Sequence, residues 1–183
     1  MSIFEFVLTG LTLVLALVLT RLLGSLRWVF HRKRRYWVHT LLVINLLVLC
    51  TLIWWGLWYQ RDAEWGYIAF AYNLLVGPGI FFVLAATLVP DIPRRVRDWE
   101  GYYYRVHRLF WGTMAALVFV MFIGSLAFTG TPLLHPTRII QAAALVLSLC
   151  GMFSARRALH GALALGMAAT VIAAVVLSAR API

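Results

Sequence analysis

Three histidines stand at the starts of three different apolar stretches of this sequence, where a pair of them could bind a haem iron or a metal ion. His39, His107 and His160 lie far apart along the chain, so only folding could bring them together. Imidazole nitrogen is a common ligand of both haem and transition metals. However, the sequence has no histidines four residues apart, no carboxylate-rich cluster and no Cys-x-x-Cys. Histidines that only make hydrogen bonds near a membrane interface are therefore the alternative interpretation.

A second candidate site surrounds Gly77-Pro78-Gly79, which falls in the middle of another apolar stretch. Proline lacks a backbone donor and clashes with the preceding turn, so a kink or a short unwound stretch is predicted. Backbone groups freed in this way bind ions or solutes in some membrane carriers. Asn73 lies one turn before the break and Asn45 lies in the preceding apolar stretch, so their two amides could converge there. A packing kink, with the asparagines hydrogen-bonded to each other or to the backbone, is the alternative.

Enzymatic chemistry has little support in this sequence. Nothing in it resembles a nucleophile elbow, a phosphate-binding glycine loop or a paired-carboxylate site. The only lysine, Lys33, falls in a charged segment, so no buried amine is available for a Schiff base. Cys50 and Cys150 are single residues within apolar stretches and are expected to be buried thiols. We therefore predict neither catalysis nor a resident cofactor, with a haem or pigment held by the histidines as the alternative.

Six apolar stretches position these residues. Of the 183 residues, 63% are hydrophobic and 12% are charged, whereas about a quarter of a globular chain is charged. A helix that crosses a bilayer needs about 20 apolar residues. The sequence therefore predicts one all-α integral membrane domain over residues 1–183, a polytopic transmembrane helix bundle with no soluble domain. Its six spans are predicted at residues 3–26, 37–59, 67–89, 109–128, 137–154 and 159–177.

Positive charge is concentrated in the loops on one side of these spans. The loops after the first, third and fifth spans contain twelve Lys and Arg residues, and the other side contains three. Because Lys and Arg are retained on the cytoplasmic side, both termini are predicted on the non-cytoplasmic side. Arg21, inside the first span, is expected to snorkel to the cytoplasmic interface. No nucleic-acid-binding motif accompanies the basic loops, so nucleic acid is not an expected partner.

Aromatic residues gather near both predicted interfaces, where Trp and Tyr favour the depth of the headgroups. The outer belt consists of Trp54, Trp55, Trp58, Tyr59, Trp65 and Tyr67. The inner belt consists of Trp28, Tyr36, Trp37, Trp99, Tyr102, Tyr103, Tyr104 and Trp111.

The loop between the third and fourth spans has the pattern of a short helix lying on the cytoplasmic leaflet. Within residues 91–108, apolar side chains recur at steps of three and four, and arginines fill much of the remaining surface. We expect this interfacial helix to contact anionic lipid headgroups, and a linker held by its aromatic residues is the alternative. The expected lipid contacts are Arg94, Arg95, Arg97, Arg105 and Arg108.

Small residues spaced by four mark surfaces where membrane helices can approach closely. Such rows recur in several spans and predict a compact bundle. Their spacing does not decide whether every row is used within one chain or one row contacts another chain. The predicted packing residues are Thr12, Ala16, Thr20 and Gly24 in the first span, Gly112 and Ala116 in the fourth, and Gly166, Thr170 and Ala174 in the sixth.

Several local strings of this sequence also resemble an uncharacterised group of small six-span bacterial inner-membrane proteins. These strings fall within residues 4–111: Phe4-Glu5-Phe6, Leu19-Thr20-Arg21-Leu22-Leu23, Tyr36-Trp37-Val38-His39, Trp54-Trp55, Pro90-Asp91 and Tyr102-Tyr103-Tyr104. The resemblance implies a bacterial inner membrane and no assigned activity.

Three functions of different kinds follow from these patterns. The first is a non-catalytic helix bundle that works by association, as a homo-oligomer or as an accessory subunit of a larger membrane complex. The second is a channel or carrier for an ion or small solute, with its site at the broken third span. The third is a membrane protein that binds haem or a pigment.

Overall fold

The computed structural model describes residues 2–31, 35–58, 60–61, 66–129, 132 and 134–180, residue 129 by its backbone alone, and every regular element within them is helical. Six helical segments are long and apolar enough to cross a bilayer. This confirms the all-α class and the number of apolar helices expected to cross the membrane, and it indicates a multi-pass membrane protein. The segments are α1 (Ile3–Val29), α2 (Trp37–Trp58), α3 with η1 and α4 (Tyr67–Ala71, Tyr72–Val76 and Gly77–Leu88), α5 (Trp99–Thr129), α6 (Pro136–Phe153) and α7 (Arg157–Arg180).

Some residues named in the sequence-based predictions lie outside the described part of the chain. They are Arg32, Lys33 and Arg34 in the first loop, Tyr59 at the predicted end of the second span, and Trp65 of the outer belt.

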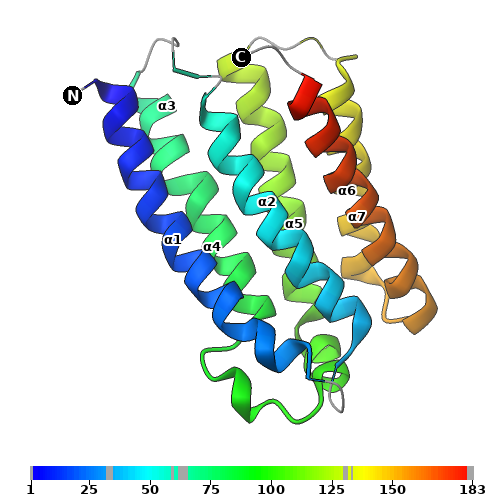
Figure 1. Ribbon diagram of the computed structural model, residues 1–183. Helices are drawn as coiled ribbons and strands as arrows, with labels where there is room; N and C mark the ends of the chain where they lie inside the picture. Colours follow the sequence, from blue (N-terminus) through cyan, green and yellow to red (C-terminus); the bar gives the residue numbers. More distant parts are fainter. Residues whose placement is uncertain are drawn as a thin grey trace.

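The six segments form a single bundle in which both chain termini lie at the same end (Figure 1). Helix α1 packs against α2 and α4, α4 against α5, α5 against α6, and α7 against both α6 and α2. Leucine, valine and aromatic side chains from α1, α2, α4, α5, α6 and α7 fill the space between them, and Phe70 of α3 packs against this core. A chain that crosses six times must return to the side from which it started, which agrees with the shared position of the termini.

Helix α1 shows how the sequence sets both the beginning and the buried face of an element. Ser2 and Glu5 form a capping box, in which the Glu5 amide donates to Ser2 Oγ over 3.2 Å and the Ser2 amide donates to Glu5 Oε2 over 2.8 Å. This box satisfies two of the amide groups that the first turn leaves without a helical partner. The side chains that α1 buries are Val7, Leu11, Leu15, Val18, Leu22, Ser25 and Val29.

The segment expected to form a separate interfacial helix has a different arrangement. Residues Pro93–Arg95 form one short 3-10 turn, and α5 begins at Trp99 and continues without interruption past Arg108. Gly101, a potential interruption, is helical because the Asp98 side chain accepts hydrogen bonds from the amides of Glu100 and Gly101 at the start of α5. The apolar periodicity seen in residues 91–108 therefore belongs largely to the first turns of a long membrane helix.

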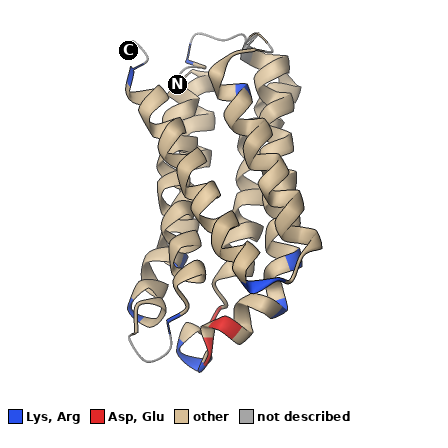
Figure 2. Ribbon diagram, turned by 90° about the vertical axis from the view of Figure 1, so that its right-hand side faces the viewer, with Lys and Arg blue, Asp and Glu red and all other residues tan. Residues whose placement is uncertain are grey.

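Charged residues gather at the end of the bundle opposite to the termini, as Figure 2 shows. We call this the arginine-rich end. Its described cations are Arg27, Arg35, Arg94, Arg95, Arg97, Arg105, Arg108, Arg156 and Arg157.

Candidate functional site

The Gly77-Pro78-Gly79 sequence lies directly after a π-helical turn rather than in an unwound stretch. The Gly77 amide donates to the carbonyl oxygen of Tyr72, five residues earlier. Proline at position 78 would clash with the carbonyl four residues before it in a regular helix, and one extra residue in the turn is the usual way to avoid that clash. The break predicted from the sequence is therefore present, but its form is a widened turn.

Side chains of this π-helical turn are fixed by the neighbouring helices. The Tyr72 hydroxyl donates to the carbonyl oxygen of Val120 in α5, and its ring lies where Gly124 leaves space for it. Leu74 occupies the space left by Gly10 of α1. These contacts give the break a packing role, because they join the third span to α5 on one side and to α1 on the other.

The two candidate asparagines are not brought together at the break. Asn73 Nδ2 donates to Gln60 Oε1 over 3.2 Å and to the Ala69 carbonyl oxygen over 3.0 Å. Asn45 lines a cavity between α2, α5, α6 and α7, and neither Asn73 nor Gly77-Pro78-Gly79 lines that cavity. The predicted mid-membrane site therefore separates into a fixed packing turn and a distinct cavity at Asn45.

Two of the three candidate histidines meet at the arginine-rich end. The rings of His107 in α5 and His160 in α7 lie 5.2 Å apart between centroids, at an angle of 87°. His39 lies in a separate contact with Trp99, 4.6 Å between ring centroids. The described residues include no group of three or more His, Cys, Asp or Glu side chains placed to hold a metal ion.

Hydrogen bonds occupy both ring nitrogens of His160. Its Nε2 lies 2.8 Å from the Ser154 carbonyl oxygen, and its Nδ1 lies 2.7 Å from the Tyr103 hydroxyl. A carbonyl only accepts, so Nε2 carries the proton and Nδ1 accepts the Tyr103 hydroxyl proton, which matches a neutral imidazole. The Trp111 indole N–H donates in turn to the Tyr103 oxygen over 2.9 Å. His160 can bind a metal only if it gives up one of these bonds.

His39 and His107 each keep one buried nitrogen without a hydrogen-bond partner among the described residues. His39 Nε2 donates to the Leu88 carbonyl oxygen over 2.9 Å, and His107 Nδ1 donates to the Tyr104 carbonyl oxygen over 2.7 Å. The unpartnered atoms are His39 Nδ1 and His107 Nε2. These two atoms are the imidazole lone pairs that a haem or a metal would have to use.

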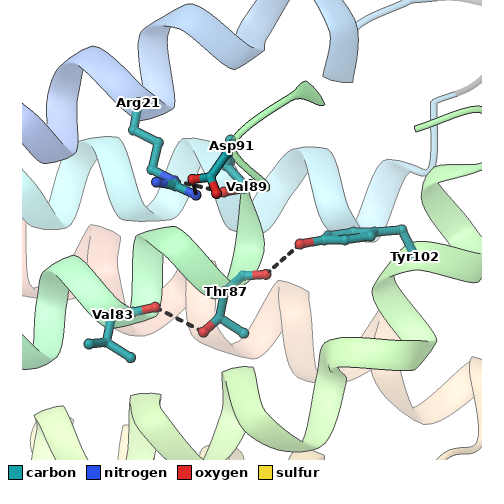
Figure 3. A network of polar contacts seen from close by, with 6 residues as sticks. All are labelled: Arg21, Val83, Thr87, Val89, Asp91 and Tyr102. Carbon is teal, nitrogen blue, oxygen red and sulfur yellow. Dashed lines mark hydrogen bonds and ion pairs between the residues drawn. The ribbon is translucent and has the colours of Figure 1, made fainter. Parts of the chain in front are cut away.

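The last carbonyl groups of the third span are capped by side chains from three other helices. Arg21 of α1 donates through Nε to the Val89 carbonyl oxygen over 2.7 Å and pairs with Asp91 at 2.6 Å, and Tyr102 of α5 donates to the Thr87 carbonyl oxygen over 2.9 Å (Figure 3). The Leu88 carbonyl oxygen, which lies between these two in the sequence, accepts a hydrogen bond from His39 of α2. A helix end leaves four carbonyls without an internal partner, and Pro90 stops the helix here. Arg21, which was expected to snorkel to the cytoplasmic interface, also holds α1 to the end of α4.

Several aromatic residues assigned to the inner belt are buried in the protein. Trp99, Tyr103 and Trp111 are at most 1% exposed. The Trp99 indole N–H donates to the Trp28 carbonyl oxygen at the end of α1 over 3.1 Å, and Trp111 lies against the bare backbone of Gly151 in α6. Sequence position alone could not separate a buried aromatic from a lipid-facing one. For Trp111, the available signal in the sequence was Gly151, three residues after Ser148, because small residues on one face of a membrane helix mark a surface where another helix can pack closely.

The rows of small residues divide into two groups. In the C-terminal half, Gly112 faces Met152 of α6, Gly166 faces Leu147 of α6, and Thr170 and Ala174 line the cavity at Asn45. Ala116 is exposed. In α1, the whole row of Thr12, Ala16, Thr20 and Gly24 is exposed, and the Trp54 indole N–H of α2 donates to the Thr12 hydroxyl over 3.1 Å. A Cβ atom at Gly24 would meet nothing within 4 Å.

The five arginines expected to contact lipid are all exposed at the arginine-rich end. Arg94, Arg95 and Arg97 line an open hollow of about 520 Å³ together with Trp28. Nearby, at the start of α2, burial raises the pKa of Tyr36, and the hydrogen bond between its hydroxyl and that of Tyr104, 3.1 Å long, raises it further. Tyr36 therefore stays a neutral hydrogen-bonding group at physiological pH.

Arg138 is a buried cation at the other end of the bundle. It is 2% exposed, and its guanidinium donates to the carbonyl oxygens of Pro132 and Phe122 and to the Ser125 hydroxyl. From the sequence it was counted only as one of the three cations on the less basic side of the membrane. The structure instead uses it to hold the end of α5 to the start of α6.

Comparisons with protein-family models, with curated proteins and with solved structures find no match to this chain.

Proposed function

We propose that this chain is a non-catalytic integral membrane bundle that works by association, and that the outer face of α1 is its contact surface. The observation that carries the proposal is the direction of the α1 row. Thr12, Ala16, Thr20 and Gly24 are exposed and form a strip of small residues beside the exposed Leu13, Leu17 and Leu23, while α1 turns its other face, with Leu11, Leu15 and Leu22, toward its own bundle. In lipid, small residues let two helices approach closely, and close packing is a main source of helix association.

A second copy of the chain is the partner that this surface fits best. A row of small residues packs most closely against another such row, and a second α1 in the same membrane supplies one in the same orientation. Contact between two identical surfaces gives a closed, two-fold symmetric pair, which is the commonest form of oligomer. Association with a different membrane subunit through the same face is the second form of the proposal.

The membrane and its lipids belong to the same proposal. We place the chain in a bacterial inner membrane, with the arginine-rich end in the cytoplasm and both termini outside it, because Lys and Arg are retained on the cytoplasmic side. Anionic headgroups would then contact the exposed arginines around the hollow at Trp28, at about 1 kcal/mol for each well-placed cation. Residues Trp99–Arg108 would lie at headgroup depth as the first turns of α5.

Energy transfer between donor-labelled and acceptor-labelled copies in liposomes tests the association. The wild-type chain is expected to show transfer that rises with the protein-to-lipid ratio. Ala16→Leu places a bulky side chain in the middle of the α1 row and should weaken association at least tenfold, which corresponds to roughly 1.4 kcal/mol. Ala169→Leu is the matched control, because Ala169 is also an exposed alanine of a membrane helix but lies on α7. It should leave association unchanged.

The possible results separate the forms of this proposal. If the wild-type chain is monomeric in liposomes but a membrane subunit co-purifies with it and is lost in Ala16→Leu, the chain is an accessory subunit. If the chain is monomeric and no partner co-purifies, or if the two variants behave alike, the proposal fails.

The other two functions predicted from the sequence draw less support from the geometry. A carrier site at the third span would need free groups at the break, and Tyr72, Asn73 and Leu74 are all held by neighbouring side chains or backbone. A haem site would have to use His39 Nδ1 or His107 Nε2, which belong to separate aromatic contacts. A visible absorption spectrum of protein purified from its native host tests the haem or pigment alternative directly.

A further inference from the structure

A cavity of about 130 Å³ lies between the pair of helices α2 and α7 and the pair α5 and α6. It is partly open to the outside of the bundle, and almost all of its wall is hydrocarbon or thioether. Its lining residues are Asn45, Leu46, Leu49 and Leu52 from α2, Met114, Leu117, Val118 and Met121 from α5, Thr137, Ile140, Gln141 and Ala144 from α6, and Met167, Thr170, Val171, Ala174 and Leu177 from α7.

Asn45 provides the unsatisfied polar group of this wall. Its side chain is 5% exposed, and its Nδ2 donor has no partner among the described residues. By contrast, the Thr170 hydroxyl donates to the Met167 carbonyl oxygen over 2.8 Å, and the Thr137 hydroxyl lies 3.1 Å from His135 Nδ1. A buried donor without an acceptor is unfavourable by about 1–3 kcal/mol. A bound molecule that carries an acceptor oxygen would remove this penalty.

The depth of Asn45 limits where that oxygen can come from. Helix α2 begins with Trp37 at the arginine-rich end of the bundle. Asn45 lies eight residues later, so it is about 12 Å along the helix from that end. In a hydrocarbon core about 30 Å thick, this places Asn45 near the middle of the bilayer. Phospholipid ester carbonyls lie at the core boundary and would not reach this depth. An acceptor other than water must therefore belong to a molecule that dissolves in the hydrocarbon core.

Size and wall chemistry describe the rest of that molecule. An apolar cavity of about 150 Å³ is large enough for a benzene ring. Three of the five methionines in the chain, Met114, Met121 and Met167, line this cavity. Thioethers are polarisable, adapt to irregular shapes and make favourable contacts with the edges of aromatic and other unsaturated rings.

From these observations we propose that the cavity at Asn45 binds a membrane-soluble ring that carries a carbonyl oxygen, such as a quinone or an aryl ketone. Asn45 Nδ2 donates to the carbonyl, the three methionines contact the ring, and any hydrocarbon tail leaves through the open side toward lipid. This binding site is independent of the α1 face, and it needs no oligomer.

Equilibrium dialysis of the full chain in phosphatidylcholine nanodiscs tests the site, with empty nanodiscs of the same lipid as the background. The probes are acetophenone and isopropylbenzene, which share a phenyl ring and the same number of non-hydrogen atoms and differ in the carbonyl oxygen. The ketone is expected to bind about three- to tenfold more tightly, the range that one hydrogen bond between neutral groups supplies. Asn45→Leu should abolish this preference while retaining binding of the hydrocarbon.

Two variants of α7 test whether the cavity itself is the binding place. Ala174→Phe fills the cavity from its half-buried rim and should abolish binding of both probes. Ala169→Phe introduces the same side chain at an exposed position of the same helix, outside the cavity lining, and should change neither affinity. Circular dichroism of each variant confirms that its helices are intact.

The proposal is overturned if the wild-type chain binds neither probe above the empty nanodiscs, which would mean that water alone satisfies Asn45. It is also overturned if the two probes bind equally, or if Asn45→Leu retains the full preference for the ketone. The association measured through α1 is read separately, so either proposal can fail while the other stands.

Discussion

The arginine-rich end of the bundle and its middle differ in how their polar groups find hydrogen-bond partners. At the arginine-rich end, polar side chains from several helices satisfy the open carbonyls where other helices stop: Arg21, His39 and Tyr102 at the end of α4, Trp99 at the end of α1 and His160 after α6. In the middle, between α2, α5, α6 and α7, Asn45 lines a cavity and its buried amide donor has no acceptor among the described residues.

This difference separates a structural role from a binding role. A polar group that is fully hydrogen-bonded within the chain has nothing left to offer a ligand, whereas an unsatisfied donor in a dry, apolar cavity gains free energy from any suitable acceptor. We therefore expect substitutions at the arginine-rich end to change mainly stability, and substitutions in the middle to change mainly binding.

The largest loss of stability is expected for His160→Leu. This change leaves the Tyr103 hydroxyl and the Ser154 carbonyl without their buried partner, and His160 is 0% exposed. Two unsatisfied groups should lower the free energy of unfolding by roughly 2–5 kcal/mol. Unfolding by a denaturing detergent in mixed micelles, followed by circular dichroism, measures the loss.

His107→Leu is the control for this prediction, because it removes the ring next to His160 while breaking only one bond, to the Tyr104 carbonyl. This variant should lower the free energy of unfolding by less than about 1 kcal/mol. Equal losses for the two variants would mean that ring packing, and not the chain of hydrogen bonds, makes this end stable.

An intermediate loss is expected for Arg21→Leu. The guanidinium both caps the buried Val89 carbonyl and pairs with Asp91, whose side chain is 87% exposed. An exposed ion pair contributes little, so the carbonyl cap should account for most of the effect. We expect the free energy of unfolding to fall by about 1.5–3 kcal/mol, the range for a hydrogen bond from a charged group.

Asp91→Asn separates the cap from the ion pair. It removes the negative charge and leaves the bond between Arg21 and the Val89 carbonyl intact, so a loss below about 1 kcal/mol is expected in the same unfolding assay. If Asp91→Asn matched Arg21→Leu, the ion pair would be the main link between α1 and α4.

The six spans and the break in the third were predictable from the sequence because both depend on local composition. Apolar length sets a membrane helix wherever it occurs, and Pro78 disturbs the turn before it in any surroundings. The form of the break was not predictable, because a π turn is stabilised here by Tyr72 and Leu74 fitting against Gly124 and Gly10, two residues of other helices.

The partners of the polar residues were beyond the sequence for the same reason. Asn73 bonds to Gln60 and not to Asn45 because the helices place those residues at different depths and faces. Trp99, Tyr103 and Trp111 have the composition of an interfacial belt, and only the packing of α5 against its neighbours turns them inward. Periodicity finds which residues share a helix face, but not which helix that face will meet.

The smallest change in stability, and the sharpest test of the contrast between the two regions, is expected for Asn45→Leu. Leucine fills about the same volume, removes an unsatisfied donor and adds apolar contact in the cavity, so the free energy of unfolding should stay unchanged or rise by up to about 1 kcal/mol. Asn73→Leu is the matched control, because it loses the bonds to Gln60 and to the Ala69 carbonyl. Its free energy of unfolding should fall by about 1 kcal/mol. A clear loss of stability in Asn45→Leu would show that this amide already has a partner inside the folded chain. The cavity in the middle of the bundle would then have no donor to offer a ligand, and the binding site proposed at Asn45 would lose its polar contact.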